Sequence, residues 1–138
     1  MKIKWIIFVM ILCLFPALCI AGNVVVISNS SVPENTLNSK DLSSIYLGKK
    51  STWSDGSKIV FVVLKDDACA SFYKDYVGKS ESQFNTYWKK QVFTGKGKPP
   101  REFDSAKEMV DFVAATKGAI GYVPAGTGIS KVKNITIK

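Results

Sequence analysis

Histidine is absent from this chain, and cysteine is scarce. The 138 residues contain no histidine and three cysteines, of which two, Cys13 and Cys19, lie in the apolar N-terminal run. Without histidine, the sequence lacks the base used by Ser-His and Cys-His catalytic systems. No group of cysteines and carboxylates has the spacing of a metal site. We therefore predict a protein that is not an enzyme and holds no metal or cofactor.

The third cysteine, Cys69, has no partner for a disulfide within the domain. A lone thiol in an oxidising compartment is either buried or available for an intermolecular bond. Burial is favoured, because free cysteine is among the most buried residue types. Asp66 and Asp67 are close to Cys69 in the sequence and would raise the pKa of its thiol. A reactive thiol is therefore not favoured.

The N-terminus carries a positive start followed by an apolar run. Two lysines lie within the first four residues, and Trp5–Ile20 is almost wholly apolar. This layout is typical of a secretory signal, with cleavage after Ala21 or Gly22. The alternative is a membrane anchor, since a helix of about 20 apolar residues spans a bilayer. Pro16 and the small residues that follow the run favour cleavage.

Cleavage would leave a single domain with a basic charge balance. We assign residues 1–21 to the signal and residues 22–138 to one domain, which is too small for two lobes with a cleft between them. The predicted location is periplasmic or secreted, with no stable membrane insertion after cleavage. Loss of the two leader lysines lowers the formal charge from +8 to +6. Export and the spread of the lysines argue against nucleic-acid binding and favour attraction to anionic solutes or envelope polyanions.

Apolar runs alternate with amphipathic segments along this domain. Runs rich in β-branched and apolar residues predict buried strands at 24–27, 59–64 and 119–123. A final edge strand is expected near the C-terminus, at 132–137. Capping residues and glycine stops predict helices between them, at 39–46, 66–77, 80–91 and 105–117. This alternation predicts a three-layer α/β domain with a mostly parallel sheet flanked by helices.

Two segments resemble a known family. Residues 42–55 (LSSIYLGKKSTWSD) and residues 116–123 (TKGAIGYV) resemble segments of phosphate-binding proteins of ABC importers, in the same order and at a similar separation. Residues 87–97 (YWKKQVFTGKG) resemble a set of short exported proteins described as substrate-binding-like. The resemblance covers about residues 24–123, which is one lobe of a full binding protein. It implies one lobe of a type II periplasmic-binding-protein-like fold and binding of phosphate or another small oxyanion in ABC-type uptake.

The residues that carry the resemblance have packing roles in our interpretation. Gly48 is expected to end a helix, and Trp53 to fill the gap between that helix and the sheet. The small residues of 118–121 allow close approach of a helix to a strand. These residues identify a scaffold rather than an activity.

The loop after the second strand is the expected ligand site. In full binding proteins the matching loop reads Arg-x-Asp-Gly-Ser-Gly-Thr, whereas residues 65–71 here read KDDACAS. Lys65 supplies a point charge without the arginine fork. Asp67 either caps the following helix or accepts a hydrogen bond from a protonated phosphate, and Ser71 offers a hydroxyl. The predicted ligand residues of this loop are Lys65, Asp67 and Ser71.

Further polar residues follow the first strand. Ser28, Asn29 and Ser30 complete the predicted ligand set, because ligands of open parallel sheets lie beyond the carboxyl ends of the strands. On this basis we expect both loops to share one edge. Lys96, Lys98 and Arg101, in a predicted glycine- and proline-rich loop, are additional groups that attract anions.

A second function stays open beside oxyanion binding. The same lobe could be a ligand-free module that docks onto an envelope protein or a sensor. Tyr73, Tyr87 or Trp88 would then be its anchors, although core packing is the favoured role for each. A single lobe that binds an anion would need a homodimer or another partner to enclose it.

Overall fold

The computed structural model describes residues 24–66 and 71–138. The predicted signal of residues 1–21, together with Asp67 and Cys69, lies outside the described residues. No helix in the described part of the chain is both long and apolar enough to cross a membrane.

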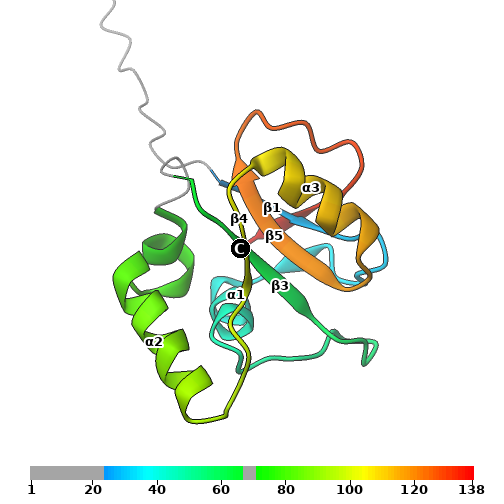
Figure 1. Cartoon of the computed structure of the whole chain (residues 1–138). Coiled ribbons are helices and arrows are strands. Elements are labelled where there is room, and N and C mark those ends of the chain that lie inside the picture. Colours follow the sequence, from blue (N-terminus) through cyan, green and yellow to red (C-terminus); the bar gives the residue numbers. More distant parts are fainter. Residues whose placement is uncertain (1–23, 67–70) are drawn as a thin grey trace, which may run out of the picture.

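Six strands form one mixed sheet (Figure 1). Their order across the sheet is β2-β6-β1-β5-β3-β4. The strands are β1 (Val24–Ser28), β2 (Thr36–Leu37), β3 (Val60–Leu64), β4 (Arg101–Phe103), β5 (Ala119–Pro124) and β6 (Lys133–Ile137).

The sheet is mostly parallel, as predicted. β3 pairs in parallel with both β4 and β5, and β2 pairs in parallel with β6. β1 is the exception, because it runs antiparallel to its neighbours β5 and β6. This single reversal decides which loops share an edge of the sheet.

Helices cover both faces of the sheet, so the predicted three-layer α/β architecture is confirmed (Figure 1). Helix α3 (Ala106–Ala115) covers one face, where a Cβ on Gly121 would lie only 2.8 Å from Met109 Sδ. Helix α1 (Ser39–Tyr46), the π-helical turn η2 (Tyr73–Val77) and helix α2 (Glu81–Phe93) lie on the other. Tyr122 of β5 stacks there on Phe72, with 3.7 Å between ring centroids.

The helix boundaries follow local capping chemistry. Ser80 and Gln83 form the predicted capping box, with both hydrogen bonds present at 3.1 and 3.0 Å. Ser105 caps α3 through Glu108 N–H. Asn38, rather than the expected Ser39, caps α1 by accepting from Asp41 N–H. An amide oxygen serves as well as a hydroxyl in this position, and the chain turns into the helix one residue earlier.

The sequence pattern missed two short strands, β2 and β4. Arg101, expected in a loop, begins β4, which pairs with β3 from Val62 to Leu64. A strand of three residues shows too little alternation to be recognised along the chain, and it forms because β3 presents an unpaired edge.

Candidate ligand groove at the carboxyl ends of β3 and β4

A groove of about 1100 Å³ lies between α2 and the edge of the sheet where β3 and β4 end. Carboxyl ends of parallel strands are the usual ligand position in open α/β sheets. Its wall combines apolar and charged residues of α2, the loop after α2, the residues at and after the end of β3, and one residue each of η2 and β4: Leu64, Lys65, Asp66, Tyr73, Glu81, Phe84, Asn85, Trp88, Lys89, Val92, Phe93, Pro99, Pro100 and Glu102.

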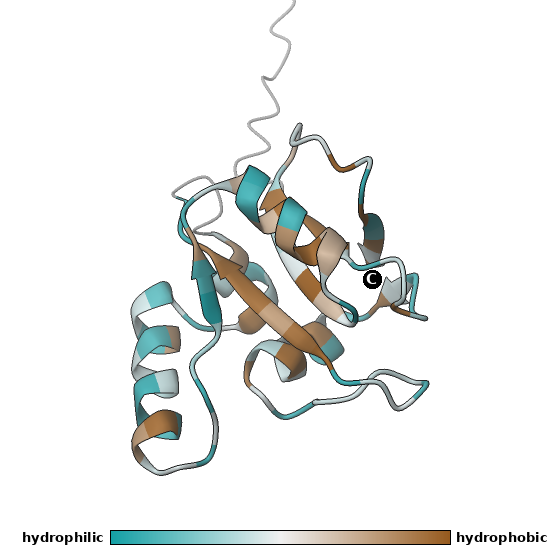
Figure 2. Ribbon diagram, turned by 45° about the vertical axis from the view of Figure 1, so that its right-hand side comes forward, coloured by the Kyte–Doolittle hydropathy of each residue, from teal (hydrophilic) through white to brown (hydrophobic). Residues whose placement is uncertain are grey.

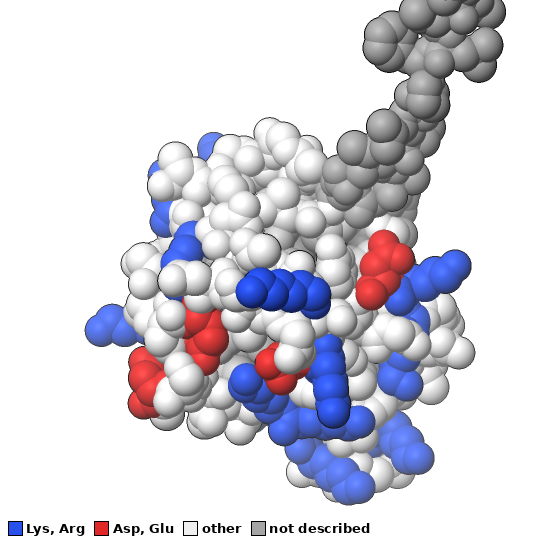
Figure 3. Space-filling model, turned by 180° about the vertical axis from the view of Figure 1, so that it is seen from behind, with Lys and Arg blue, Asp and Glu red and all other residues white. Residues whose placement is uncertain are grey.

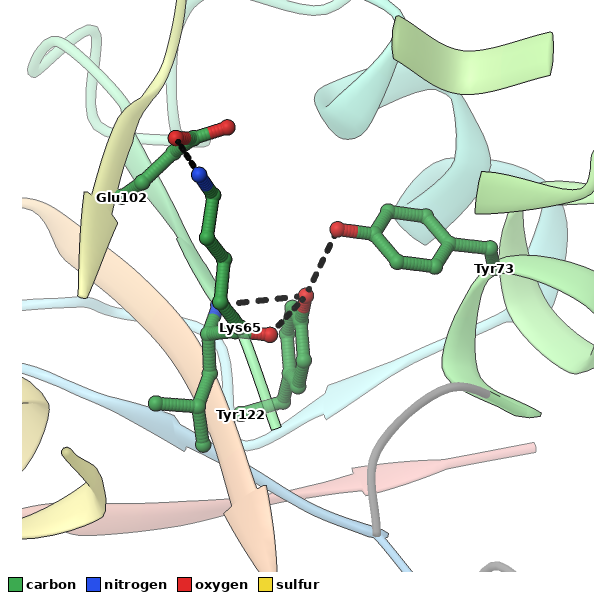
Figure 4. Close-up of polar contacts among 5 residues, drawn as sticks. Lys65, Tyr73, Glu102 and Tyr122 are labelled. Carbon is green, nitrogen blue, oxygen red and sulfur yellow. Dashed lines mark hydrogen bonds and ion pairs between the residues drawn. The ribbon is translucent and has the colours of Figure 1, made fainter. Parts of the chain in front are cut away.

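Lys65, the predicted cation, is held by a carboxylate. Its Nζ lies 2.8 Å from Glu102 Oε2, and both side chains are about half exposed (Figure 4). The hydrogen bond to Glu102 raises the pKa of Lys65, so the lysine stays charged at neutral pH. β4 places Glu102 here, because its pairing sets Phe103 beside Leu64.

The hydroxyl of Tyr73, a residue of the groove lining, lies beside that of the buried Tyr122 (Figure 4). Tyr122 Oη accepts from Leu64 N–H at 3.2 Å and lies 3.4 Å from Tyr73 Oη. Burial raises the pKa of both hydroxyls. They therefore stay protonated at neutral pH and can donate hydrogen bonds, but they do not serve as bases.

The formal charges along the groove nearly cancel. Lys65 and Lys89 face three carboxylates on its lining, those of Asp66, Glu81 and Glu102. Carboxylates near a site repel an anion, unless the anion carries a proton that it can donate. The groove therefore favours a ligand with both acceptor and donor oxygens over a fully ionised one.

The register of the sheet separates the two predicted ligand loops. Ser28 and Phe61 are both level with Ile120, so Ser28 lies beside the beginning of β3. Lys65 is four residues further along, roughly 13 Å at the usual rise of a strand. The expectation that both loops share an edge is therefore wrong, because β1 runs antiparallel to β5.

The loop after β1 is tied into the fold. Asn29 is buried, and its Nδ2 donates to the carbonyl oxygens of Val113 at 2.8 Å and Ala114 at 3.0 Å, at the end of α3. Its Oδ1 accepts from Ser31 N–H. Ser28 is fully buried, and Ser30 is exposed.

Replacing Asn29 by alanine should lower the free energy of unfolding by about 2 kcal/mol, because two buried carbonyls lose their donor. Chemical denaturation monitored by circular dichroism measures this loss. Ser30→Ala, at the exposed neighbouring position, is the control and should change the unfolding free energy by less than about 0.5 kcal/mol. Equal stability of the two variants would contradict a capping role for Asn29.

Other predicted residues divide between groove and core. Ser71 is half-buried and helical, two residues before η2. Tyr73 and Trp88 are buried, which confirms core packing over exposed anchors, and Tyr87 donates to the Leu47 carbonyl oxygen at 2.7 Å. Arg101 stacks over aromatic rings, 4.9 Å from the ring centroid of Phe112.

Sequence reasoning missed Glu102 as a groove residue and Tyr122 as the partner of Leu64 behind the groove wall. Glu102 has no local signal, because only the pairing of β4 with β3 brings it to Lys65. Tyr122 lies in a strand segment interpreted as packing, and its hydroxyl accepts from Leu64 N–H of the neighbouring strand. Among residues 24–66 and 71–138, no group of three or more His, Cys, Asp or Glu side chains is placed to hold a metal ion.

The chain is similar in fold to solved structures whose descriptions name phosphate binding or phosphate transport. The chain is similar to an ABC-type phosphate transport receptor from Vibrio cholerae, with 18% identity and a TM-score of 0.61 over 83% of this chain and 45% of that chain. It is similar to PstS from Borrelia burgdorferi, with 15% identity and a TM-score of 0.63 over 83% of this chain and 47% of that chain.

A third structure carries a ligand. It is described as a phosphate ABC transporter substrate-binding protein with bound phosphate, from Clostridium perfringens, with 18% identity and a TM-score of 0.63 over 83% of this chain and 44% of that chain. The chain thus spans less than half the length of these structures. No model of a protein family and no curated protein matches it. The likeness confirms the predicted resemblance at the level of fold.

Proposed function

We propose that this protein is an exported, non-enzymatic solute-binding protein that holds phosphate or another small oxyanion in the groove at the carboxyl ends of β3 and β4, in connection with ABC-type uptake. The observation that carries the proposal is the position of Lys65. It lies directly after β3, on the wall of the groove, in a fold shared with phosphate receptors.

Lys65 can bind an anion by exchanging partners. Its ammonium is held by Glu102. A phosphate that carries one proton can accept from Lys65 and donate to Glu102, so both charges keep a hydrogen-bond partner. The neighbouring hydroxyl of Tyr73, held protonated, supplies a further donor at the groove wall.

One lobe leaves the ligand partly open to water. The groove is large compared with a phosphate, and a two-lobed binding protein would close a second domain over it. We propose that a second copy of the chain or an envelope protein supplies the missing wall. The predicted signal at residues 1–21 would deliver the protein to the compartment where such a partner is present.

A ligand-free interaction module is the second candidate function. The observation that favours it is the charge balance, with three carboxylates against two lysines on the groove wall. In this case the Lys65–Glu102 pair neutralises the former anion site, and the fold serves to dock an envelope protein or a sensor.

The melting temperature of the purified protein with millimolar phosphate discriminates between the two functions. Phosphate at about one hundred times its dissociation constant adds roughly 2.7 kcal/mol of stability, or several degrees. Sulfate and chloride at the same ionic strength are the ion controls. Glu102→Gln releases Lys65 from its charged partner and should change the rise in melting temperature that phosphate causes. Lys65→Ala should abolish this rise.

Lys131→Ala is the matched control variant. It breaks the exposed Lys131–Asp111 ion pair, whose 3.5 Å contact lies away from the groove, and should leave the phosphate response unchanged. If no anion shifts the melting temperature of the wild-type protein, oxyanion binding is refuted and the interaction module becomes the supported function.

A further inference from the structure

Three segments meet at the side chain of Trp88, at one end of the molecule. They are α2 itself, the loop after α1 and the loop after α2. A Cβ on Gly48 would lie 2.9 Å from Trp88 Cη2, and a Cβ on Gly97 would lie 3.1 Å from Trp88 Cζ3. The loop after α1 and the loop after α2 therefore both approach the indole ring of α2. The indole Nε1 also donates to the Tyr46 carbonyl oxygen at 3.0 Å, which ties α2 to the end of α1.

These three segments carry a concentrated positive charge. Residues 47–53 and 88–100 contain no aspartate or glutamate. They contain six lysines, which we call the lysine end of the molecule: Lys49, Lys50, Lys89, Lys90, Lys96 and Lys98. Figure 3 shows basic side chains gathered at the lower end of the molecule, towards which the last turn of α2 points in Figure 1.

A large aromatic side chain projects from the same end. Phe93, the last residue of α2, is 92% exposed, and its neighbour Val92 is 42% exposed. Phe93 follows Lys89 and Lys90 by four and three residues, so the three share one side of the helix. Figure 2 shows this hydrophobic last turn below a largely polar outer surface of α2.

The aromatic is held on an ordered helix end. Lys96 N–H donates to the Gln91 carbonyl oxygen at 2.9 Å, and Gly95 N–H donates to the Val92 carbonyl oxygen at 3.1 Å. Together with the left-handed Gly95, at φ 72°, these bonds form a Schellman motif. The backbone of Lys96, three residues after Phe93, is therefore fixed at the helix end.

Favourable contact with the helix dipole explains lysines in the last turn of α2. It does not explain an aromatic ring in water beside them. An exposed ring on the same side of a helix as lysines is a pattern of proteins that lie on membranes, where the ring enters the interface and the lysines contact acidic headgroups.

We propose that the lysine end docks this protein onto a lipid surface that contains anionic headgroups. Phe93, with Val92 beside it, inserts at the boundary between headgroups and acyl chains, and the six lysines contact the lipid phosphates. A soluble polyanion would be bound by the lysines alone and would leave Phe93 in water. Charge complementarity together with the exposed apolar side chains therefore favours the lipid surface.

Vesicle sedimentation of the purified protein tests this assignment. Vesicles of equal parts phosphatidylglycerol and phosphatidylcholine should bind the protein, and vesicles of phosphatidylcholine alone should not. The double variant K96Q/K98Q should bind the anionic vesicles about 30-fold more weakly, at roughly 1 kcal/mol per lysine. F93S should weaken binding about tenfold, because the apolar insertion is lost.

The double variant K107Q/K117Q is the matched control. It removes the same charge from exposed positions on α3 and just after it, outside the lysine end, and should bind the vesicles within about twofold of the wild type. Because Phe93 is exposed, F93S should keep the wild-type melting temperature. The two double variants change no residue of the groove lining, so their phosphate response is measured independently of vesicle binding.

Three results would overturn the proposal. The first is equal binding to both vesicle types, or to neither. The second is unchanged binding by F93S together with weak binding by K96Q/K98Q, which would make the surface a polyanion site. The third is a wild-type dimer in sedimentation equilibrium that F93S dissociates, which would assign the surface to a second copy of this chain.

Discussion

Replacing Gly118 by alanine should destabilise the protein by about 4 kcal/mol, near the upper end of single-substitution effects. A Cβ at this position would lie 2.2 Å from the backbone oxygen of Lys58, and φ is +77°. The clash is with backbone, so no side-chain rotation relieves it. The required shift would also strain the hydrogen bonds from Trp53 Nε1 and Val60 N–H to the Gly118 carbonyl oxygen, both near 3 Å.

The Gly126→Ala variant separates two contributions to the loss of stability, the steric clash and the left-handed backbone conformation. Gly126 has φ +89°, but nothing lies within 4 Å of a Cβ built there. Alanine at this position should cost only about 1 kcal/mol, the penalty of a left-handed non-glycine residue. Urea denaturation of both variants gives the comparison. Similar losses for the two variants would show that close packing against Lys58 is not what requires Gly118.

Trp88→Ala should lower the free energy of unfolding by about 3–5 kcal/mol, the range for truncating a buried aromatic residue. The indole is 7% exposed and contacts Phe61, with 5.5 Å between ring centroids. Its loss leaves a cavity between α2 and the sheet and removes the donor to the Tyr46 carbonyl oxygen. Thermal and urea unfolding measure the effect.

Tyr87→Phe is the control for the hydrogen-bond part of this loss. It removes the bond from Tyr87 to the Leu47 carbonyl oxygen and keeps the ring, so about 1 kcal/mol is expected. If Trp88→Ala were no more destabilising than Tyr87→Phe, Trp88 would not be the residue that holds α1 and α2 together.

Local chemistry along the chain was sufficient to predict the main elements. The capping box at Ser80 and Gln83, and the left-handed glycines Gly48, Gly78 and Gly118, act within a few residues of their own position. Their patterns are therefore visible in sequence. The apolar run at 59–64 similarly predicts a buried strand, since burial on both faces requires consecutive apolar residues.

Only some residues of the candidate groove could be predicted from the sequence. Lys65 could be found because it directly follows a recognisable strand. Its partner Glu102 could not, since β4 has three residues and exists through its pairing with β3. The role of Asn29 was equally hidden, because its amide bonds to carbonyls 84 and 85 residues away.

The sequence by itself determined a three-layer α/β lobe, its helix caps and glycine stops, and a resemblance to phosphate-binding proteins, because these depend on periodicity and neighbouring residues. Only the tertiary structure decided that Ser28 and Lys65 lie at opposite ends of the strands, that Glu102 holds Lys65, and that two lysine-containing loops approach Trp88. The direction of β1 and the approach of Gly48 and Gly97 to the Trp88 ring both depend on contacts between residues far apart in the sequence. They depend on which distant surfaces pack together, and no local pattern encodes that choice.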